Sequence, residues 1–242
     1  MPKITFEVCV DTPEGLVRAQ RGGADRVELC SALAIGGLTP TRAFMRFAAA
    51  QSMPAHVMIR PREGDFCFSA AEVQLMLDEI ALAREENMQG VVLGATCEDG
   101  SLDQNTLEKL VVAAEGMDLT LHRAFDVTPD PYAALEAAIA LGFNRILSSG
   151  QQITALAGKA LLASLVAEAD GRIEIMPGSG INPDNLHTLA EVMPLTSVHA
   201  SCSSPEQQSP EAVSRLGFSG AQGRRQTNLA MVQRMAKALA EI

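Results

Sequence analysis

The chain has 242 residues, of which 47% are hydrophobic and 20% are charged, and its formal net charge is −10 at pH 7. This composition supplies a sizeable core, while the acidic balance without a basic cluster argues against nucleic acids and anionic membranes as partners. No apolar run is long enough to span a bilayer. The first residues contain no apolar secretory segment, so we expect a cytoplasmic protein whose five cysteines stay reduced.

Strand-like and helix-like segments alternate along the chain. In chain order, the pattern predicts a strand and a helix in turn at residues 3–9, 13–21, 25–30, 39–50, 56–60, 69–87, 90–95, 103–114, 119–123, 131–141, 145–149, 154–169, 172–176, 183–191, 197–201 and 228–242. Two helices carry clear boundary signals. Gly22 and Gly23 end the first helix, and Ser69 with Glu72 forms a capping box at the third.

Eight strands, each followed by a helix, predict an α/β fold of the (β/α)8 TIM-barrel type, formed as a single domain by residues 1–242. A doubly wound open sheet is the alternative. Residues 202–225 are rich in Ser, Gln and Gly, and we expect them to form an irregular loop or an oligomer contact. Residues 226–242 are expected to contain the closing helix.

Polar side chains recur at the ends of the predicted strands, where barrel active sites are built. Alternation along the strands places these side chains in the upper lumen: Glu7, Cys9, Glu28, Cys30, Arg60, His122 and His199. Burying so many polar groups costs several kcal/mol unless they are paired or used. The alternative to a functional site is an ion-pair network in which the two glutamates pair with Arg60 and Arg123.

The two cysteines of this set, Cys9 and Cys30, each follow a glutamate by two positions on neighbouring strands, which lie ~4.8 Å apart. Matched positions would bring two thiolates to one soft ion. Two thiolates suit Cu(I), with the Met58 thioether or a histidine as a third ligand. The alternative is that both cysteines are small buried apolar residues, and their spacing alone favours that alternative because it is not a Cys-x-x-Cys motif.

The same strand ends also fit an enzyme acting on a small anionic, sugar-like or phosphorylated substrate, with or without a metal ion. In such an enzyme His122 or Glu28 would be the acid/base group. The catalytic candidates are the strand-end acids and bases Glu7, Glu28, His122, Asp126 and His199. The substrate-binding candidates are two guanidinium groups and three glycines of the turns after strands six and seven: Arg60, Arg123, Gly150, Gly178 and Gly180.

Glycines in these turns let backbone amides approach a ligand, and TIM barrels often hold phosphate at the loops after strands seven and eight. A tight turn without a ligand explains the same spacing. No lysine lies at the carboxyl end of a predicted strand, which disfavours a Schiff-base aldolase.

Several motifs of the chain resemble those of the CutC copper-homeostasis family. The resemblance runs from about residue 4 to His199 and is carried by residues 7–11 (EVCVD), 22–31 (GGADRVELCS), 36–40 (GGLTP), 59–62 (IRPR), 64–66 (GDF), 122–126 (HRAFD), 145–150 (RILSSG) and 176–180 (MPGSG).

That resemblance implies a TIM barrel, a cytosolic location and a role in copper handling. The family's two shared cysteines correspond to Cys9 and Cys30, so the resemblance implies Cu(I) binding through this pair. The expected partner is therefore a copper ion or a small anionic ligand. A homo-oligomer, in the simplest case a dimer, is compatible with the sequence.

Overall fold

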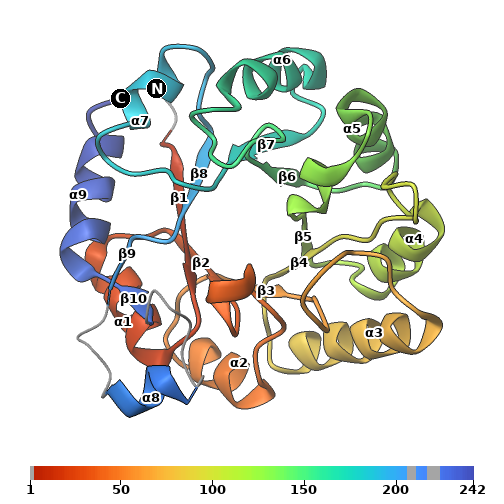
Figure 1. Ribbon diagram of the computed structural model, residues 1–242, viewed down its shortest axis with the longest axis horizontal. Coiled ribbons are helices and arrows are strands. Elements are labelled where there is room, and N and C mark those ends of the chain that lie inside the picture. The colour runs from red at the N-terminus through yellow and green to blue at the C-terminus, as the bar shows by residue number, and fades with distance from the viewer. Residues whose placement is uncertain (1–2, 206–210, 217–223) are drawn as a thin grey trace.

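The structure is a computed structural model that describes residues 3–205, 211–216 and 224–242. Eight parallel strands form a nearly closed ring with helices around it (Figure 1). Hydrogen-bonded neighbours follow the order β7-β6-β5-β4-β3-β2-β1-β8. The terminal members of this order, β7 and β8, also lie side by side. The predicted (β/α)8 barrel is therefore confirmed, and the open doubly wound sheet is excluded.

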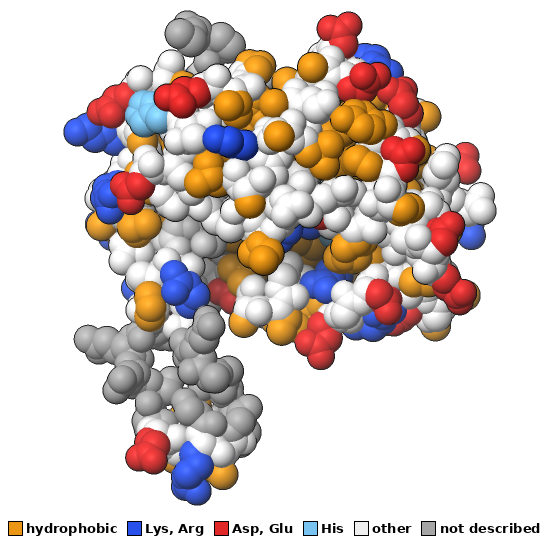
Figure 2. All heavy atoms as spheres, turned by 45° about the horizontal axis from the view of Figure 1, so that its top comes forward, with side chains coloured by type: hydrophobic (Ala, Val, Ile, Leu, Met, Phe, Trp, Pro, Cys, Tyr) orange, Lys and Arg blue, Asp and Glu red, His pale blue; other side chains and the backbone are white. Residues whose placement is uncertain are grey.

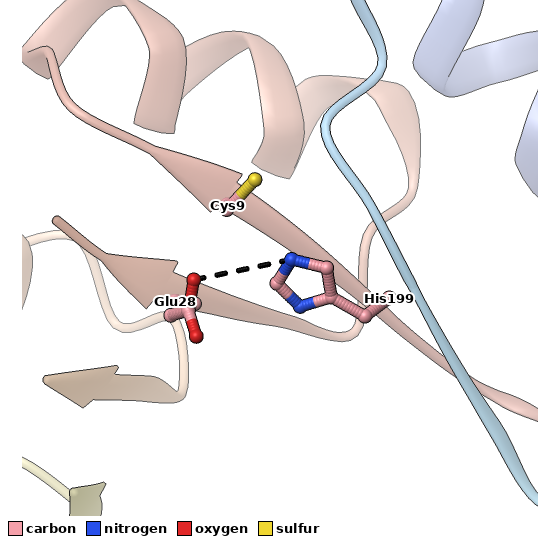
Figure 3. Close-up of side chains that lie close together, drawn as sticks. All are labelled: Cys9, Glu28 and His199. Carbon is pink, nitrogen blue, oxygen red and sulfur yellow. Dashed lines mark ion pairs between the residues drawn. The ribbon is translucent and has the colours of Figure 1, made fainter. Parts of the chain in front are cut away.

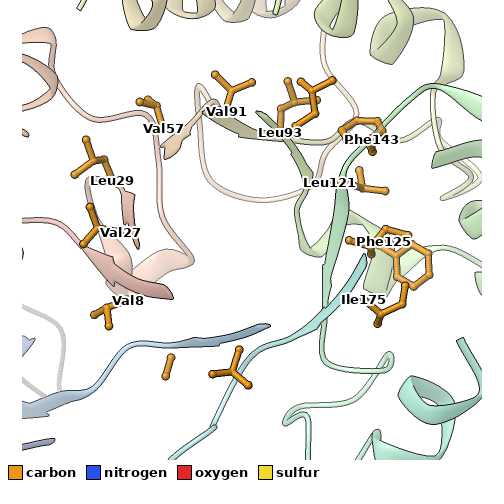
Figure 4. Close-up of a cluster of buried hydrophobic side chains, with 14 of the residues drawn as sticks. Val8, Val27, Leu29, Val57, Val91, Leu93, Leu121, Phe125, Phe143 and Ile175 are labelled. Carbon is orange, nitrogen blue, oxygen red and sulfur yellow. The ribbon is translucent and has the colours of Figure 1, made fainter. Parts of the chain in front are cut away.

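The barrel strands are short, as expected for strands whose two faces are both covered. They are β1 (Thr5–Val10), β2 (Arg26–Leu29), β3 (Ala55–Met58), β4 (Gly90–Leu93), β5 (Asp118–Leu121), β6 (Arg145–Ser148), β7 (Glu174–Pro177) and β8 (Ser197–Ala200). Alternate side chains on one face pack against the helices and form an apolar shell around the ring. Figure 4 shows labelled members of this shell, among them Val8, Leu29 and Leu93. Each fully buried side chain of this size contributes about 1.5–3 kcal/mol.

The outer helices are α1 (Pro13–Gly22), α2 (Arg42–Ala49), α3 (Ala70–Glu85), α4 (Gln104–Ala113), α5 (Pro131–Ala140), α6 (Lys159–Ala169), α7 (Leu186–Ala190) and α9 (Leu229–Leu239). Two single-turn 3-10 helices, η1 (Leu33–Ile35) and η2 (Arg123–Val127), follow β2 and β5. The capping box predicted at α3 is confirmed, since Ser69 and Glu72 bond each other's backbone amides. In the described part of the chain, no helix is long and apolar enough to cross a bilayer.

Three helices begin three or more residues later than the sequence pattern predicts. The helix predicted at 39–50 begins at Arg42, after the N-cap Thr41. The helix predicted at 154–169 begins at Lys159, and the residues before it form a separate turn in which the Gly158 amide donates to Thr154 O at 3.1 Å. The helix predicted at 183–191 is the short α7, because Asn182 and Asn185 bond neighbouring backbone amides and form turns instead. Asparagine side chains often compete with helix formation in this way.

The segment 202–225 was expected to be irregular, and its described residues correct part of that expectation. They include a two-stranded antiparallel ribbon of β9 (Ser203–Pro205) and β10 (Arg225–Thr227), and the short helix α8 (Glu211–Arg215). The expected oligomer contact falls partly on residues 206–210 and 217–223, which lie outside the described residues.

On the face shown in Figure 2, lysines and arginines lie singly among acidic and apolar side chains.

The lower lumen, at the amino ends of the strands, is filled by ion pairs. Arg145, the first residue of β6, donates to the carboxylates of Asp118 and Glu174, the first residues of β5 and β7. The distances are 3.0 Å from Nη2 to Asp118 Oδ2 and 2.9 Å from Nε to Glu174 Oε2. Arg145 also donates to Thr120 Oγ1 at 3.0 Å. One buried guanidinium therefore bridges two carboxylates at the base of the barrel.

Replacing this guanidinium is expected to destabilise the fold strongly. In Arg145→Leu both carboxylates lose their partner, so the free energy of unfolding should fall by about 3 kcal/mol. This loss is at the low end of the range for breaking a buried ion pair. The side chains of Asp118 and Glu174 are 33% and 25% exposed, so water can partly solvate the two carboxylates when the guanidinium is removed. Urea denaturation measures the loss.

The matched control is Arg172→Leu, which removes an exposed ion pair with Glu136. Exposed pairs contribute about 0–1 kcal/mol, so this variant should unfold close to the wild-type midpoint. Equal destabilisation by the two substitutions would contradict the role assigned to the lower-lumen pairs.

Candidate ligand-binding site at the barrel mouth

A cavity of about 380 Å³ opens at the carboxyl ends of the barrel strands. Its polar wall consists of Cys9, Glu28, Arg60, His122, Arg123 and His199, and its apolar wall includes Leu33, Ile35, Met58, Phe66 and Leu147. Most of the polar residues predicted for the upper lumen therefore share one cavity. Glu7, Cys30 and Asp126 do not line it, and each instead contacts residues of the polar wall.

The carboxylate of Glu7 holds two cationic groups from neighbouring strands. It accepts hydrogen bonds from Arg26 Nε at 2.5 Å and from His199 Nδ1 at 2.8 Å. Burial acts to raise the pKa of Glu7, but His199 and Arg26 lower it by more, so the net pKa lies far below its ordinary value. Glu7 is thus a permanently ionised positioning group. This ion pair replaces the expected pairing with Arg60 or Arg123.

Arg26 was missed in the sequence analysis, although a signal for it exists. Every second residue of a strand faces the same side. Arg26 is two residues before Glu28, so the alternation that places Glu28 and Cys30 in the lumen also places Arg26 there. The structure confirms this, since Arg26 is buried between Glu7 and the Met176 sulfur.

The register of β1 and β2 corrects one expectation about the cysteines. Cys9 lies opposite Glu28, and Glu7 lies opposite Arg26. Cys9 and Cys30 are therefore offset by two residues and do not occupy matched positions. Barrel closure requires such a stagger between strands, so equal positions in sequence motifs lie at different depths of the lumen.

This stagger brings a thiol, a carboxylate and an imidazole together. Ligand atoms of Cys9, Glu28 and His199 all lie within 4.8 Å of one another, and the three side chains are buried (Figure 3). The His199 Nε2 atom is 3.9 Å from Glu28 Oε2. Because Glu7 engages Nδ1, the ring presents Nε2 to the other two groups. A histidine ordered by a carboxylate in this way is typical of metal sites.

Cys30 lies beside this cluster and contacts Glu28. Its Sγ donates to Glu28 Oε2 at 3.3 Å, and burial, reinforced by the nearby Glu28 carboxylate, raises the pKa of the Cys30 thiol well above its ordinary value. Burial also raises the pKa of Glu28. The other oxygen, Glu28 Oε1, is buried and has no hydrogen-bond partner among the residues that the structure describes. Glu28 therefore retains a free oxygen for a ligand.

Arg60 joins two loops above the barrel. Its guanidinium donates to the carbonyls of Ile35 at 3.0 Å, Gly37 at 3.1 Å and Gly64 at 3.0 Å, so it connects the loop after β2 to the loop after β3. Its Cζ atom lies 5.1 Å from the ring centre of Phe66. Arg60 lines the cavity. Among the described residues, it forms no ion pair with Glu7 or Glu28.

His122 caps η2 through its side chain. Nδ1 accepts a hydrogen bond from the amide of Ala124 at 3.1 Å, so the ring proton of the neutral imidazole is on Nε2. Burial, with a contribution from Arg60, lowers the pKa of His122 to about 3. The ring is therefore neutral at physiological pH, and its Nε2 has no partner among the described residues.

Asp126 is fully engaged in building the loop after β6. It accepts from Arg123 Nε at 2.7 Å, from Ser148 Oγ at 2.6 Å and from the Ser149 amide at 3.0 Å. It also accepts from the Gln151 amide at 3.2 Å. Asp126 thus fixes Arg123 and the loop, and Arg123 remains on the cavity wall.

The glycines of the predicted phosphate-binding turns mainly contact other residues of the protein. The amide of Gly178 donates to Ser148 O at 2.9 Å, and the amide of Gly150 donates to Ser148 Oγ at 2.9 Å. A Cβ on Gly150 would lie 2.3 Å from Gly158 O, and one on Gly178 would lie 2.5 Å from Leu147 Cδ1. Gly180 alone of the three lines the cavity. Substrate binding by these glycines stays a prediction.

Comparison with known proteins gives a consistent result. A model of the CutC family matches residues 4–204. A relative from Agrobacterium fabrum (strain C58), named family protein CutC, is 52% identical over 231 residues, covering 95% of this chain and 92% of its own. A relative of the same name from Sinorhizobium medicae is 48% identical, covering 99% of this chain and 97% of its own.

Solved structures agree with the fold. A protein from Streptococcus agalactiae, described as a candidate copper homeostasis protein CutC, is 32% identical with a TM-score of 0.78, covering 82% of this chain and 98% of its own. A phosphoribosylanthranilate isomerase from Thermotoga maritima is 14% identical with a TM-score of 0.59, covering 99% of this chain and 100% of its own. The second likeness shows the fold alone.

The hydrogen bond at His122 predicts a definite ring state. Long-range ¹H–¹⁵N spectra of the histidines should show Nδ1 unprotonated and Nε2 protonated, unchanged between about pH 8 and pH 5, because the pKa of this ring is lowered to about 3. In urea the same ring should titrate near 6.5. A doubly protonated His122 in the folded protein at pH 6 would contradict the prediction.

Proposed function

Because the chain belongs to the CutC family, we propose that it is a cytosolic copper-homeostasis protein that binds Cu(I) at the barrel mouth. One observation carries the proposal: the thiol of Cys9, the carboxylate of Glu28 and the imidazole of His199 converge within 4.8 Å. The relative from Streptococcus agalactiae, whose name refers to copper homeostasis, supports the choice of ion.

The donor set suits a soft ion. Thiolate and imidazole ligands select Cu(I) and Zn²⁺ over hard ions, and Cys9 Sγ and His199 Nε2 would supply one of each after losing their protons. Burial acts to lower the pKa of His199, but Glu28 and Glu7 raise it by more, so binding of the ion would release the ring proton. The orphan oxygen of Glu28 offers a third ligand, and a buried polar atom without a partner is itself a sign of a missing ligand. Glu7 would then hold His199 in the orientation that binding requires.

The structure gives the two cysteines different parts in this proposal. Cys9 belongs to the group of three, whereas Cys30 donates its S–H to Glu28 and has a raised pKa. The raised pKa of Cys30 opposes formation of the thiolate that a soft ion requires. We therefore assign metal binding to Cys9, and to Cys30 the support of Glu28.

An enzyme acting on a small anionic substrate is the second candidate, and one observation favours it. Burial raises the pKa of Glu28, a residue of the cavity wall, and its buried Oε1 has no partner among the described residues. Of the two acid/base candidates expected from the sequence, Glu28 is the better fit, because the lowered pKa of His122 keeps that ring neutral.

Anaerobic Cu(I) titration of the purified protein tests the copper proposal. The wild type should bind one equivalent. Cys9→Ala removes a ligand and should weaken the affinity by more than about 100-fold, whereas Cys30→Ala removes only support for Glu28 and should weaken it about tenfold. Equal losses in the two variants would favour the paired-cysteine site expected from the sequence over the site assigned here.

The matched control is Cys97→Ala, because Cys97 is an exposed thiol away from the cavity. It should bind Cu(I) as the wild type does. If a Cys9→Ala/Cys30→Ala double variant still bound one equivalent of Cu(I), the barrel mouth would not be the copper site.

A further inference from the structure

Arg60 is a buried cation that lacks a counter-ion. Only 6% of the residue is exposed, and no carboxylate pairs with it in the ranges that the structure describes. Three carbonyl oxygens accept from its terminal nitrogens, but its buried Nε has no partner among the described residues. A buried charge is costly unless it is paired, so an anion at this position would be strongly favoured.

His122 supplies a second unused donor on the same wall. The residue is 3% exposed, and its Nδ1 is occupied by the amide of Ala124. The remaining nitrogen, Nε2, therefore carries the proton and is buried without a partner in the described part of the chain, and the residue lines the cavity. While Nδ1 accepts from Ala124, the ring proton stays on Nε2, so this nitrogen is available to a ligand as a hydrogen-bond donor. The ring also lies outside the Cys9–Glu28–His199 cluster.

Phe66 brings the two donors to one place. Its ring centre lies 4.9 Å from that of His122 and 5.1 Å from Arg60 Cζ. The three residues come from the ends of β3 and β5 and from the loop that Arg60 pins. Two buried donors, one of them cationic, thus lie against a single aromatic ring on the wall of the cavity.

We propose that Arg60 and His122 bind the oxyanion, carboxylate or phosphate, of a small organic ligand beside the Cys9–Glu28–His199 cluster. Hydrogen bonds from guanidinium and imidazole N–H groups to an oxyanion are charge-assisted and strong. The apolar side chains Leu33, Ile35 and Leu147 line the rest of the cavity and suit a carbon skeleton. The volume of about 380 Å³ is at the small end for ligand pockets, which restricts the ligand to a small metabolite.

This site does not depend on the copper proposal, because neither donor is a metal ligand. Calorimetric titration of the full chain, freed of metal with a chelator, tests it with inorganic phosphate and separately with acetate at constant ionic strength set by sodium chloride. One equivalent of at least one of the two anions should bind. The anion that binds more tightly identifies the ligand as a phosphate or a carboxylate.

The key variant is His122→Asn. The asparagine Oδ1 can still accept from the amide of Ala124, so the cap of η2 is kept while the Nε2 donor is lost. The affinity for the anion should fall at least about tenfold. Arg60 is not a suitable target, because its substitution would also release the loops that it connects.

Two controls make the test decisive. Arg62→Gln removes a nearby positive charge that pairs with Glu72 and Asp65 outside the cavity wall, and it should bind the anion as the wild type does. Cys9→Ala should lose Cu(I) and keep the anion, so failure of one proposal is distinguishable from failure of the other.

The ring signal of His122 gives a second readout in the unmodified protein. Its Nε2–H resonance should shift on addition of the binding anion and not on addition of chloride. Absence of saturable binding for both phosphate and acetate would overturn the proposal, as would full affinity in His122→Asn or an unshifted ring signal at saturation.

Discussion

The buried carboxylate of Glu7 is the interaction on which the candidate site depends. It lies within the lumen, accepts from Arg26 on one side and His199 on the other, and is kept ionised by both. Because Nδ1 of His199 is engaged there, only Nε2 can face Cys9 and Glu28. A charge this deep is tolerable only with its partners in place, so the residues that stabilise the middle of the barrel also determine the geometry at its mouth.

The mouth separates into two kinds of chemistry that share one cavity. On one side, Cys9, Glu28 and His199 would hold a cation that displaces the protons of the thiol and of the His199 ring. On the other side, Arg60 and His122 offer N–H donors to an anion. Asp126 and the glycine turns support the loops around them. A ligand carrying both a metal-binding group and an acidic group would use the whole cavity.

Much of this arrangement follows from the sequence, and the remainder depends on geometry that a sequence does not contain. Alternating apolar residues and capping signals predict the barrel and place Glu28, His122 and His199 in its lumen. The stagger of the strands, however, is a property of the closed ring, and it makes Glu28 rather than Cys30 the neighbour of Cys9. The partners of Arg60 are backbone carbonyls of two loops, and residue types cannot reveal contacts of that kind.

The ion pairs that fill the lower lumen have a consequence for exchange. Arg145 with its carboxylates and Arg26 with Glu7 lie across the lumen beneath the cavity, so we expect a ligand to exchange through the mouth of the barrel and not through its base. Cys9, Glu28 and His199 belong to the strands themselves, whereas Arg60 and His122 follow strand ends. The two proposed sites share this mouth, so a ligand bound at either one is expected to slow exchange at the other.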